Sequence, residues 1–371
     1  MKVAFLTNLR APYRTLQLNE FSAIQDLELN VFYTNDPKTN RNWNITKDIN
    51  YKEIDLRGIK LFKKNIYLNS GIFNIVKNHE LIILGGYEQP SMILTALYCK
   101  LMRKPYVLIF DGISVDRLNI KENSIKYKIK KFIINNSFSI MANGSIGKMY
   151  FRDIFKYPES RIFNQYLSVD GEKIDSMYCD KSIYRSIYRN KLGIRDKDKV
   201  IIYSGRLIDI KNVDSIVRAI KECKVEDIVF LIVGGGILNN YIKTIATQLG
   251  VKVIITDFIE SQEELFKHYF VGDLLVLPSY VEPWGLVVNE AMHAGLPVVV
   301  SENCGCSLDL VIEGKNGYRF NPNNYKDLSN IINKIFLENT IETMGIESKL
   351  IIKDWNFANS RKNLIKILNN I

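Results

Sequence analysis

Short apolar segments alternate with segments of helical length through the second half of this sequence. The apolar segments are short and rich in β-branched residues, which is typical of buried strands: 200–204, 229–233, 251–256, 274–277 and 298–300. Strands that are joined through helices form a parallel sheet with right-handed crossovers. The alternation therefore predicts a doubly wound α/β domain.

The first half predicts a similar but less regular pattern. Strands are expected at 3–7, 27–33, 51–55, 81–84, 106–110 and 139–142, the last of which is expected to close this half. A helix is expected from about Thr15 to Ala23, after a loop from Asn8 to Arg14. Because 371 residues exceed the usual size of one hydrophobic core, two domains are expected, joined near Gln165 to Asp180.

Composition excludes several classes of protein. The hydrophobic content of 47% and the charged content of 24% are ordinary for a globular protein. The five cysteines form no CxxC pair and the three histidines are scattered, so neither disulfides nor a metal site is expected. The amino terminus lacks the pattern of a signal peptide, and no apolar run approaches the roughly 20 residues of a membrane-spanning helix. A cytoplasmic protein is expected.

The excess of positive over negative charge is confined to the first half. Residues 1–165 carry 25 Lys and Arg against 14 Asp and Glu, whereas residues 166–371 carry 25 against 26. The most basic stretch is Arg117 to Lys131, in which Ile125, Ile129, Phe132 and Ile133 share one helical face. Such a helix either lies on an anionic membrane surface or packs its apolar stripe on its own core. No nucleic-acid-binding motif accompanies it, so nucleic acid is not an expected partner.

Two glutamates mark the stretch from Tyr280 to Ser301. Glu282 precedes a loop that turns into a helix at about Leu286, and Glu290 lies one turn into that helix. The N–H groups at such a helix start attract anions or hydroxyl oxygens, and a glutamate in the helix can accept the two hydroxyls of a ribose. Trp284 is expected to wall the ligand pocket, and Gly285 to allow close approach of backbone. The alternative is a pair of solvated glutamates beside an ordinary loop.

Two further loops of the second half carry candidate binding groups. Arg206 and Lys211 follow the strand 200–204, where both can converge on a diphosphate or remain solvated. The three glycines 234–236 resemble a dinucleotide-binding loop, with Asp257 near the position of a ribose-binding acid. Asn239 occupies the position of the third glycine, so that fingerprint is incomplete.

Candidate residues of the first half also follow strands. Arg10 and Arg14 lie in the first strand-to-helix loop, where they face a phosphate or a sugar unless they are solvated. Asp111 follows the strand 106–110. It either holds an acceptor hydroxyl and takes its proton, or caps the following turn.

These motifs occur in an order that resembles a known family. GRLIDIKN at 205–212, VGGG at 233–236 and DLLVLPSYVEPWGLVVNEAMHAGLPVV at 273–299 resemble the retaining glycosyltransferases of family 4, which have the GT-B fold. The resemblance is looser over 1–165, where Pro12 to Arg14 carries it. It implies two Rossmann-like domains facing a cleft: an acceptor-binding domain at 1–168 and a nucleotide-sugar-binding domain at 169–355. A final helix at 356–371 crosses back to the first domain.

The resemblance also implies roles for individual residues. Arg206 and Lys211 would bind the donor diphosphate and stabilise the leaving group without a metal. Glu282 would contact the donor sugar and Glu290 the ribose. The remaining donor contacts would come from backbone N–H groups of Gly285 and Leu286, and from Ile259 near the base.

The sequence departs from the family pattern in two places. The first loop reads Arg10-Ala11-Pro12 where the family often has paired glycines, and Asp111 stands where a histidine is frequent. Arg10 or Arg14 would replace the glycines at the phosphates, or that loop would serve the acceptor instead.

The function expected from sequence is transfer of a sugar from a nucleotide diphosphate, with a UDP-sugar favoured, to a hydroxyl of a glycan or lipid-linked acceptor. The anomeric configuration would be retained and no cofactor would be needed. The expected setting is synthesis of a bacterial surface polysaccharide such as capsule or O-antigen, at the inner face of the plasma membrane. The alternatives are an NAD-dependent oxidoreductase and a glycan- or lipid-binding protein without catalysis.

Overall fold

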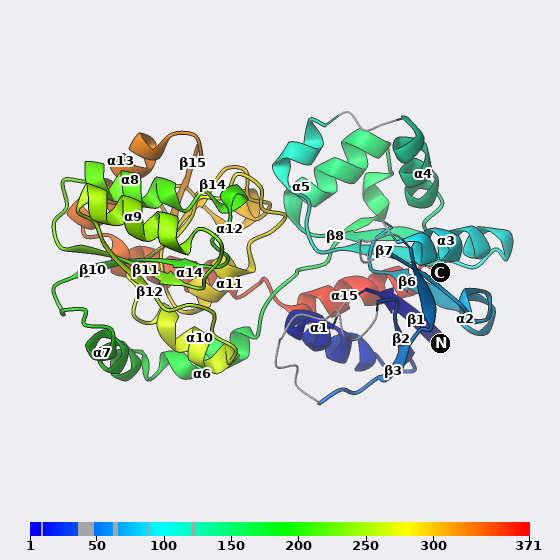
Figure 1. Ribbon diagram of the computed structural model, residues 1–371. Helices are drawn as coiled ribbons and strands as arrows, with labels where there is room; N and C mark the ends of the chain where they lie inside the picture. The colour runs from blue at the N-terminus through cyan, green and yellow to red at the C-terminus, as the bar shows by residue number, and fades with distance from the viewer. Residues whose placement is uncertain (9, 36–47, 62–65, 88, 121–123) are drawn as a thin grey trace. The chain divides into compact units, whose positions relative to one another are not determined.

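The computed structural model describes residues 1–8, 10–35, 48–61, 66–87, 89–120 and 124–371 (Figure 1). The chain divides into two compact units. Unit 1 comprises residues 1–113, 117–167 and 356–371, and unit 2 comprises residues 114–116 and 168–355. Each unit contains one parallel sheet with helices on both faces.

The sheet of unit 1 has the strand order β3-β2-β1-β6-β7-β8-β9, and every neighbouring pair is parallel. Its strands are β1 (Lys2–Thr7), β2 (Glu28–Tyr33), β3 (Lys52–Asp55), β6 (Leu81–Leu84), β7 (Tyr106–Phe110), β8 (Ser139–Ala142) and β9 (Ile162–Asn164). The central strands are buried, which accounts for their continuous runs of apolar residues.

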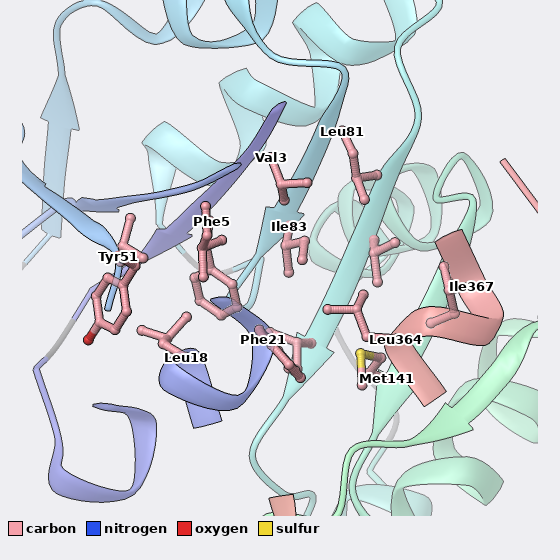
Figure 2. Close-up of a cluster of buried hydrophobic side chains, with 14 of the residues drawn as sticks. Val3, Phe5, Leu18, Phe21, Tyr51, Leu81, Ile83, Met141, Leu364 and Ile367 are labelled. Carbon is pink, nitrogen blue, oxygen red and sulfur yellow. The ribbon is translucent and has the colours of Figure 1, made fainter. Parts of the chain in front are cut away.

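Helices cover both faces of this sheet (Figure 1). One face carries α1 (Pro12–Ser22) and α15 (Phe357–Leu368), and the other carries α2 (Ile72–Asn78), α3 (Pro90–Leu101), α4 (Ser124–Asn135) and α5 (Gly144–Met149). Figure 2 shows Leu364 and Ile367 of α15 in the same buried cluster as Phe21 of α1. The final helix therefore completes the core of unit 1, which confirms the expected return of the chain to its first domain.

The sheet of unit 2 has the order β12-β11-β10-β13-β14-β15, again with parallel pairs throughout. Its strands are β10 (Lys199–Ser204), β11 (Ile228–Val233), β12 (Lys252–Ile255), β13 (Leu274–Leu277), β14 (Val298–Ser301) and β15 (Gly317–Phe320). One face carries α8 (Asp214–Glu222), α9 (Asn239–Leu249) and α13 (Tyr325–Leu337). The other carries α6 (Gly171–Tyr178), α7 (Lys181–Lys191), α10 (Gln262–Tyr269), α11 (Leu286–His293) and α14 (Ile341–Ile352). The short helix α12 (Ser307–Leu310) follows β14.

Several elements differ from the sequence expectation. The first helix begins at Pro12 rather than near Thr15. Proline is favoured at the first helical position, because a backbone N–H there would have no acceptor within the helix and proline has none to leave unpaired. Strand 139–142 is not the last of unit 1, since β9 pairs with it. The segment between β2 and α2 contains an antiparallel pair, β4 (Gly58–Leu61) and β5 (Ile66–Asn69), which was not expected from sequence. Residues 36–47 and 62–65 of that segment lie outside the described residues.

Among the described helices, none has the length and apolar character needed to cross a bilayer.

Candidate functional site

The strand order of unit 2 reverses between β10 and β13. Open α/β sheets bind ligands at such a switch point, beyond the carboxyl ends of the strands. The loop after β10 and the loop after β13 are joined there by two hydrogen bonds. The Tyr280 N–H donates to the Ile210 carbonyl at 2.9 Å, and the Asn212 amide donates to the Pro278 carbonyl at 3.2 Å.

Lys211 and Glu282 meet across these two loops. The Lys211 ammonium donates to the Glu282 carboxylate, and both side chains are largely buried. Lys211 ends a single 3₁₀ turn, after which Asn212 adopts a left-handed φ of 53°. The structure thus brings together two residues that the sequence places 71 positions apart.

The loop around Cys304 and Cys306 hydrogen bonds to the main chain of the Glu282 loop. The Gly305 N–H donates to the Glu282 carbonyl at 2.9 Å, and the Cys306 N–H donates to the Trp284 carbonyl at 3.2 Å. Burial raises the pKa of both thiols well above the usual range, so they remain neutral. The sequence does not indicate the contact of this loop with Glu282, because the pairing depends on the adjacency of β13 and β14.

Helix α11 begins at Leu286, as expected. Gly285 precedes it with a φ of 103°, and a Cβ at this position would lie 2.9 Å from Leu277 Cδ2. Both observations require glycine. The first N–H groups of α11 have no acceptor within the helix, so this end remains suited to an anion or a hydroxyl oxygen.

The side chain of Trp284 does not wall a pocket, which corrects the sequence expectation. It is buried and stacks on Trp355, with ring centroids 4.8 Å apart. Its indole N–H donates to Asn289 Oδ1 at 3.0 Å. The tryptophan therefore anchors the loop to the core, and its side chain is not available to a donor.

Glu290 lies one turn into α11 and contacts a buried tyrosine. Tyr269 Oη donates to Glu290 Oε2 at 2.5 Å. Burial raises the pKa of the Glu290 carboxyl to about 7, and the Tyr269 hydrogen bond acts in the opposite direction. Sequence reasoning missed Tyr269, because its place before β13 gives no sign of a contact with α11.

Arg206 lies on the same edge and is exposed. Among the described residues its guanidinium forms no ion pair. Its carbonyl accepts a hydrogen bond of 3.0 Å from the buried Tyr203 hydroxyl, which fixes the backbone of the loop. Burial raises the pKa of the Tyr203 hydroxyl, Glu282 raises it further, and Arg206 lowers it.

The three glycines 234–236 allow two loops to touch. A Cβ on Gly234 would lie 2.2 Å from the Gly205 carbonyl oxygen, and a Cβ on Gly236 would lie 2.4 Å from the Leu207 carbonyl oxygen. Asn239 Nδ2 donates to Asp257 Oδ1 at 3.1 Å. Close packing therefore accounts for the glycines that suggested a dinucleotide fingerprint. Ile259 follows β12 and is partly exposed at the same edge of the sheet.

Arg14 and Asp111 form a buried polar network in unit 1. Arg14 lies in the first turn of α1 rather than in a loop, and its guanidinium donates to Asp111 and to Gln17. Burial opposes the Arg14 charge, but Asp111 more than offsets this, so the pKa of Arg14 is raised. Tyr13 Oη also donates to Asp111, at 3.0 Å.

Arg10 is also bound by carboxylates. Its guanidinium donates to Asp55 Oδ1 at 2.8 Å and to Glu53 Oε2 at 3.3 Å, and it lies 3.7 Å above the ring of Tyr33. These carboxylates offset the positive charge of Arg10, which the sequence offered as a candidate group for binding a phosphate. Arg10 is therefore paired within unit 1 and is not a solvated arginine.

Comparisons with known proteins find similarity in sequence and in fold. Residues 185–349 match the family model of glycosyl transferases group 1. An uncharacterized glycosyltransferase of Methanocaldococcus jannaschii is 32% identical over 175 residues, which are 46% of this chain and 44% of that protein. The matched segment thus spans less than half the length of that relative.

Solved structures with the same fold cover the whole chain. Anabaena HepE in complex with UDP has a TM-score of 0.80 at 18% identity, with 100% of both chains covered. The lipopolysaccharide outer core galactosyltransferase WaaB has a TM-score of 0.70 at 17% identity, with 100% of this chain and 99% of that chain covered. The chain has the GT-B fold, and its segment 185–349 is similar to the glycosyl transferases group 1 family.

Proposed function

We propose that the protein is a retaining glycosyltransferase that uses a nucleotide-diphosphate sugar, with a UDP-sugar favoured, and needs no metal ion. The observation that carries this proposal is the convergence of Lys211 and Glu282 at the switch point of unit 2. Arg206 lies on the loop of Lys211, and Glu290 lies on the helix that follows Glu282. The solved complexes of HepE with UDP and with UDP-glucose support the choice of donor.

The reaction breaks the bond between the anomeric carbon and the diphosphate oxygen. Negative charge develops on that oxygen, and the two cations Arg206 and Lys211 stabilise it. A lysine ammonium has three donors, so Lys211 can keep its bond to Glu282 and still reach a phosphate. The acceptor hydroxyl then forms its bond to the anomeric carbon on the face from which the diphosphate departs, and its proton passes to the departing diphosphate oxygen.

The two glutamates bind the neutral parts of the donor. The Gly305 N–H binds the main-chain carbonyl of Glu282, and Lys211 binds one carboxylate oxygen, which leaves the other to accept sugar hydroxyls. Glu290 accepts the ribose hydroxyls. The N–H groups at the start of α11 bind sugar oxygens, and Ile259 lies against the base.

A donor panel tests this proposal. The protein is incubated with UDP-, GDP- and ADP-sugars, with and without EDTA, and release of the nucleotide diphosphate is measured. We expect release from a UDP-sugar that EDTA does not change. Tight binding of NAD without release would favour the oxidoreductase alternative, and binding of a sugar nucleotide that is never cleaved would favour a non-catalytic binding protein.

Unit 1 is proposed to bind the acceptor, a glycan or a lipid-linked sugar of a bacterial surface polysaccharide. Asp111 is partly exposed and held by Arg14 and Tyr13, so it can orient an acceptor hydroxyl. Arg10 lies beside Glu53 and Asp55, whose oxygens accept hydrogen bonds from hydroxyl groups.

A basic and apolar surface on α3 and α4 is proposed to rest on the inner face of the plasma membrane. Ile125 and Ile129 of α4 are 69% and 42% exposed, and Leu97 and Leu101 of α3 are 46% and 75% exposed. The two helices contact each other, with Lys100 Nζ lying 4.7 Å from the centre of the Phe132 ring. Of the apolar stripe of α4, Ile133 is buried, whereas Ile125 and Ile129 are exposed. Residues 121–123, which precede the helix, lie outside the described residues.

Liposome flotation tests the membrane surface. Replacing Lys126, Lys128, Lys130 and Lys131 with glutamine should reduce partitioning onto anionic vesicles by about two orders of magnitude or more, since each lysine contributes roughly 1 kcal/mol near such a surface. The matched control replaces a set of lysines of unit 2: Lys197, Lys221, Lys224 and Lys243. Unchanged flotation of the α4 variant, or an equal loss in the control, would contradict the proposal.

A further inference from the structure

A buried tyrosine contacts the glutamate of the candidate donor site. The side chain of Tyr269, the last residue of α10, is fully buried. Its hydroxyl donates to Glu290 Oε2 on α11 at 2.5 Å. The hydrogen bond thus joins the end of α10 to the helix that carries Glu290.

We propose that Tyr269 is a positioning residue, which holds Glu290 as a carboxylate oriented to accept the ribose hydroxyls of the nucleotide. The inference rests on the proposed function, because it concerns the same donor site. Tyr269 is buried beneath Glu290 and does not itself contact the ligand. It acts through the glutamate, by occupying one carboxylate oxygen and leaving the other for the nucleotide.

The chemistry of the pair explains why a tyrosine is needed. Ribose hydroxyls donate to a carboxylate, whereas a protonated carboxyl group would present a donor to them. Burial raises the pKa of Glu290 to about 7, so near neutral pH the empty site is divided between the two forms. A hydroxyl that donates to the carboxylate favours the charged form. Tyr269 therefore increases the fraction of protein that is ready to bind.

The other ionisable groups around α11 are bound to partners of their own. Ahead of the helix, Glu282 binds Lys211. At its far end His293 lies 3.0 Å from Asp175 of α6, which also binds Lys349 of α14. On α10, next to Tyr269, the charged groups are Glu263, Glu264, Lys267 and His268, which bind one another, the backbone, Lys173 or Tyr188. On β10 the adjacent Tyr203 donates to the Arg206 carbonyl. Tyr269 is the group among these that donates to Glu290.

The first measurement needs no ligand. Glutamate labelled with ¹³C at Cδ is incorporated, and the Glu290 signal is identified by its loss in Glu290→Gln. We expect a midpoint of about 7 for the unaltered protein, and a midpoint higher by about one pH unit in Tyr269→Phe, which loses one hydrogen bond to a charged group. Tyr106→Phe is the matched control, because Tyr106 is equally buried but donates to the Ile133 carbonyl in unit 1.

The second measurement is the Kd for UDP of Tyr269→Phe divided by that of the unaltered protein. With the midpoints above, this ratio should be about eightfold at pH 6.5 and less than about twofold at pH 8.5. Titration of the UDP phosphate cancels in the ratio. In a Glu290→Gln background, Tyr269→Phe should cause no further loss.

The outcomes separate the inference from the proposed function. A ratio that is constant with pH, or a Glu290 midpoint that Tyr269→Phe does not move, overturns the positioning role, because a merely structural tyrosine would give either result. If the unaltered protein binds no UDP, GDP or ADP while the midpoint still moves, the proposed function fails and the coupling of Tyr269 to Glu290 stands.

Discussion

Replacing Lys211 with methionine is expected to lower release of nucleotide diphosphate by about 10²–10³-fold, the effect of removing one donor from a developing negative charge. The reason is that Lys211 lies at the switch point of unit 2, with one ammonium proton on Glu282 and the others available to the diphosphate. Turnover at saturating UDP-sugar is the measurement. Glu282→Gln should cause a loss of similar size, because it removes the charge that orients Lys211.

The controls for this prediction separate catalysis from folding. Removing one partner leaves a largely buried charge unpaired, whereas the double variant Lys211→Met/Glu282→Gln leaves none. The double variant should therefore melt close to the unaltered protein and still be inactive. Lys197→Ala removes an exposed lysine that pairs with Asp227, ahead of β10 at the opposite edge of the sheet, and should retain full activity. Activity of Lys211→Met near that of the unaltered protein would refute the site assignment.

Asp273→Asn is expected to destabilise unit 2 by about 3–5 kcal/mol, the usual cost of breaking a buried ion pair. Asp273 accepts from Arg185 at 2.6 Å, from Arg189 at 2.9 Å and from the Val200 N–H at 2.7 Å. The side chain of Arg189 is 2% exposed, so the substitution leaves a buried guanidinium without its carboxylate. Thermal unfolding should show a fall in Tm of about 10 °C for a unit of this size.

The matched control for this second prediction is Asp227→Asn. Asp227 also binds two cations, Arg195 and Lys197, but these are more than half exposed. Exposed pairs contribute roughly 0–1 kcal/mol, and asparagine tolerates the left-handed φ of 58° at this position. Equal losses of Tm in the two variants would show that burial of Arg189 is not the cause.

The local parts of the candidate site were predictable from sequence. The start of α11 at Leu286 follows from a glycine with a left-handed φ before a run of helix-forming residues, and the strands follow from their length and β-branched composition. The convergence of Lys211 and Glu282 followed from the doubly wound pattern, because that pattern brings the loops after β10 and β13 to one edge.

Pairings between distant side chains were not predictable in the same way. Arg14 and Asp111 are 97 positions apart, and neither sequence context shows that one neutralises the other. Trp284 follows a candidate glutamate in a loop, where a ligand contact is a natural interpretation, but its partner Trp355 lies at the end of unit 2. Strand β9 has only three residues, so it lacks the length by which a strand is recognised.

The placement of α15 has a consequence for how the protein is made. Leu364 and Ile367 belong to the core that also contains Phe5 and Phe21, and Ser360 accepts a 3.0 Å hydrogen bond from Gln17. Residues 1–167 of unit 1 therefore lack part of their core until residues 356–371 are translated. Unit 2, which lies between the two parts, can complete its own core earlier. We therefore expect unit 1 to complete its core after unit 2, although most residues of unit 1 are synthesised first.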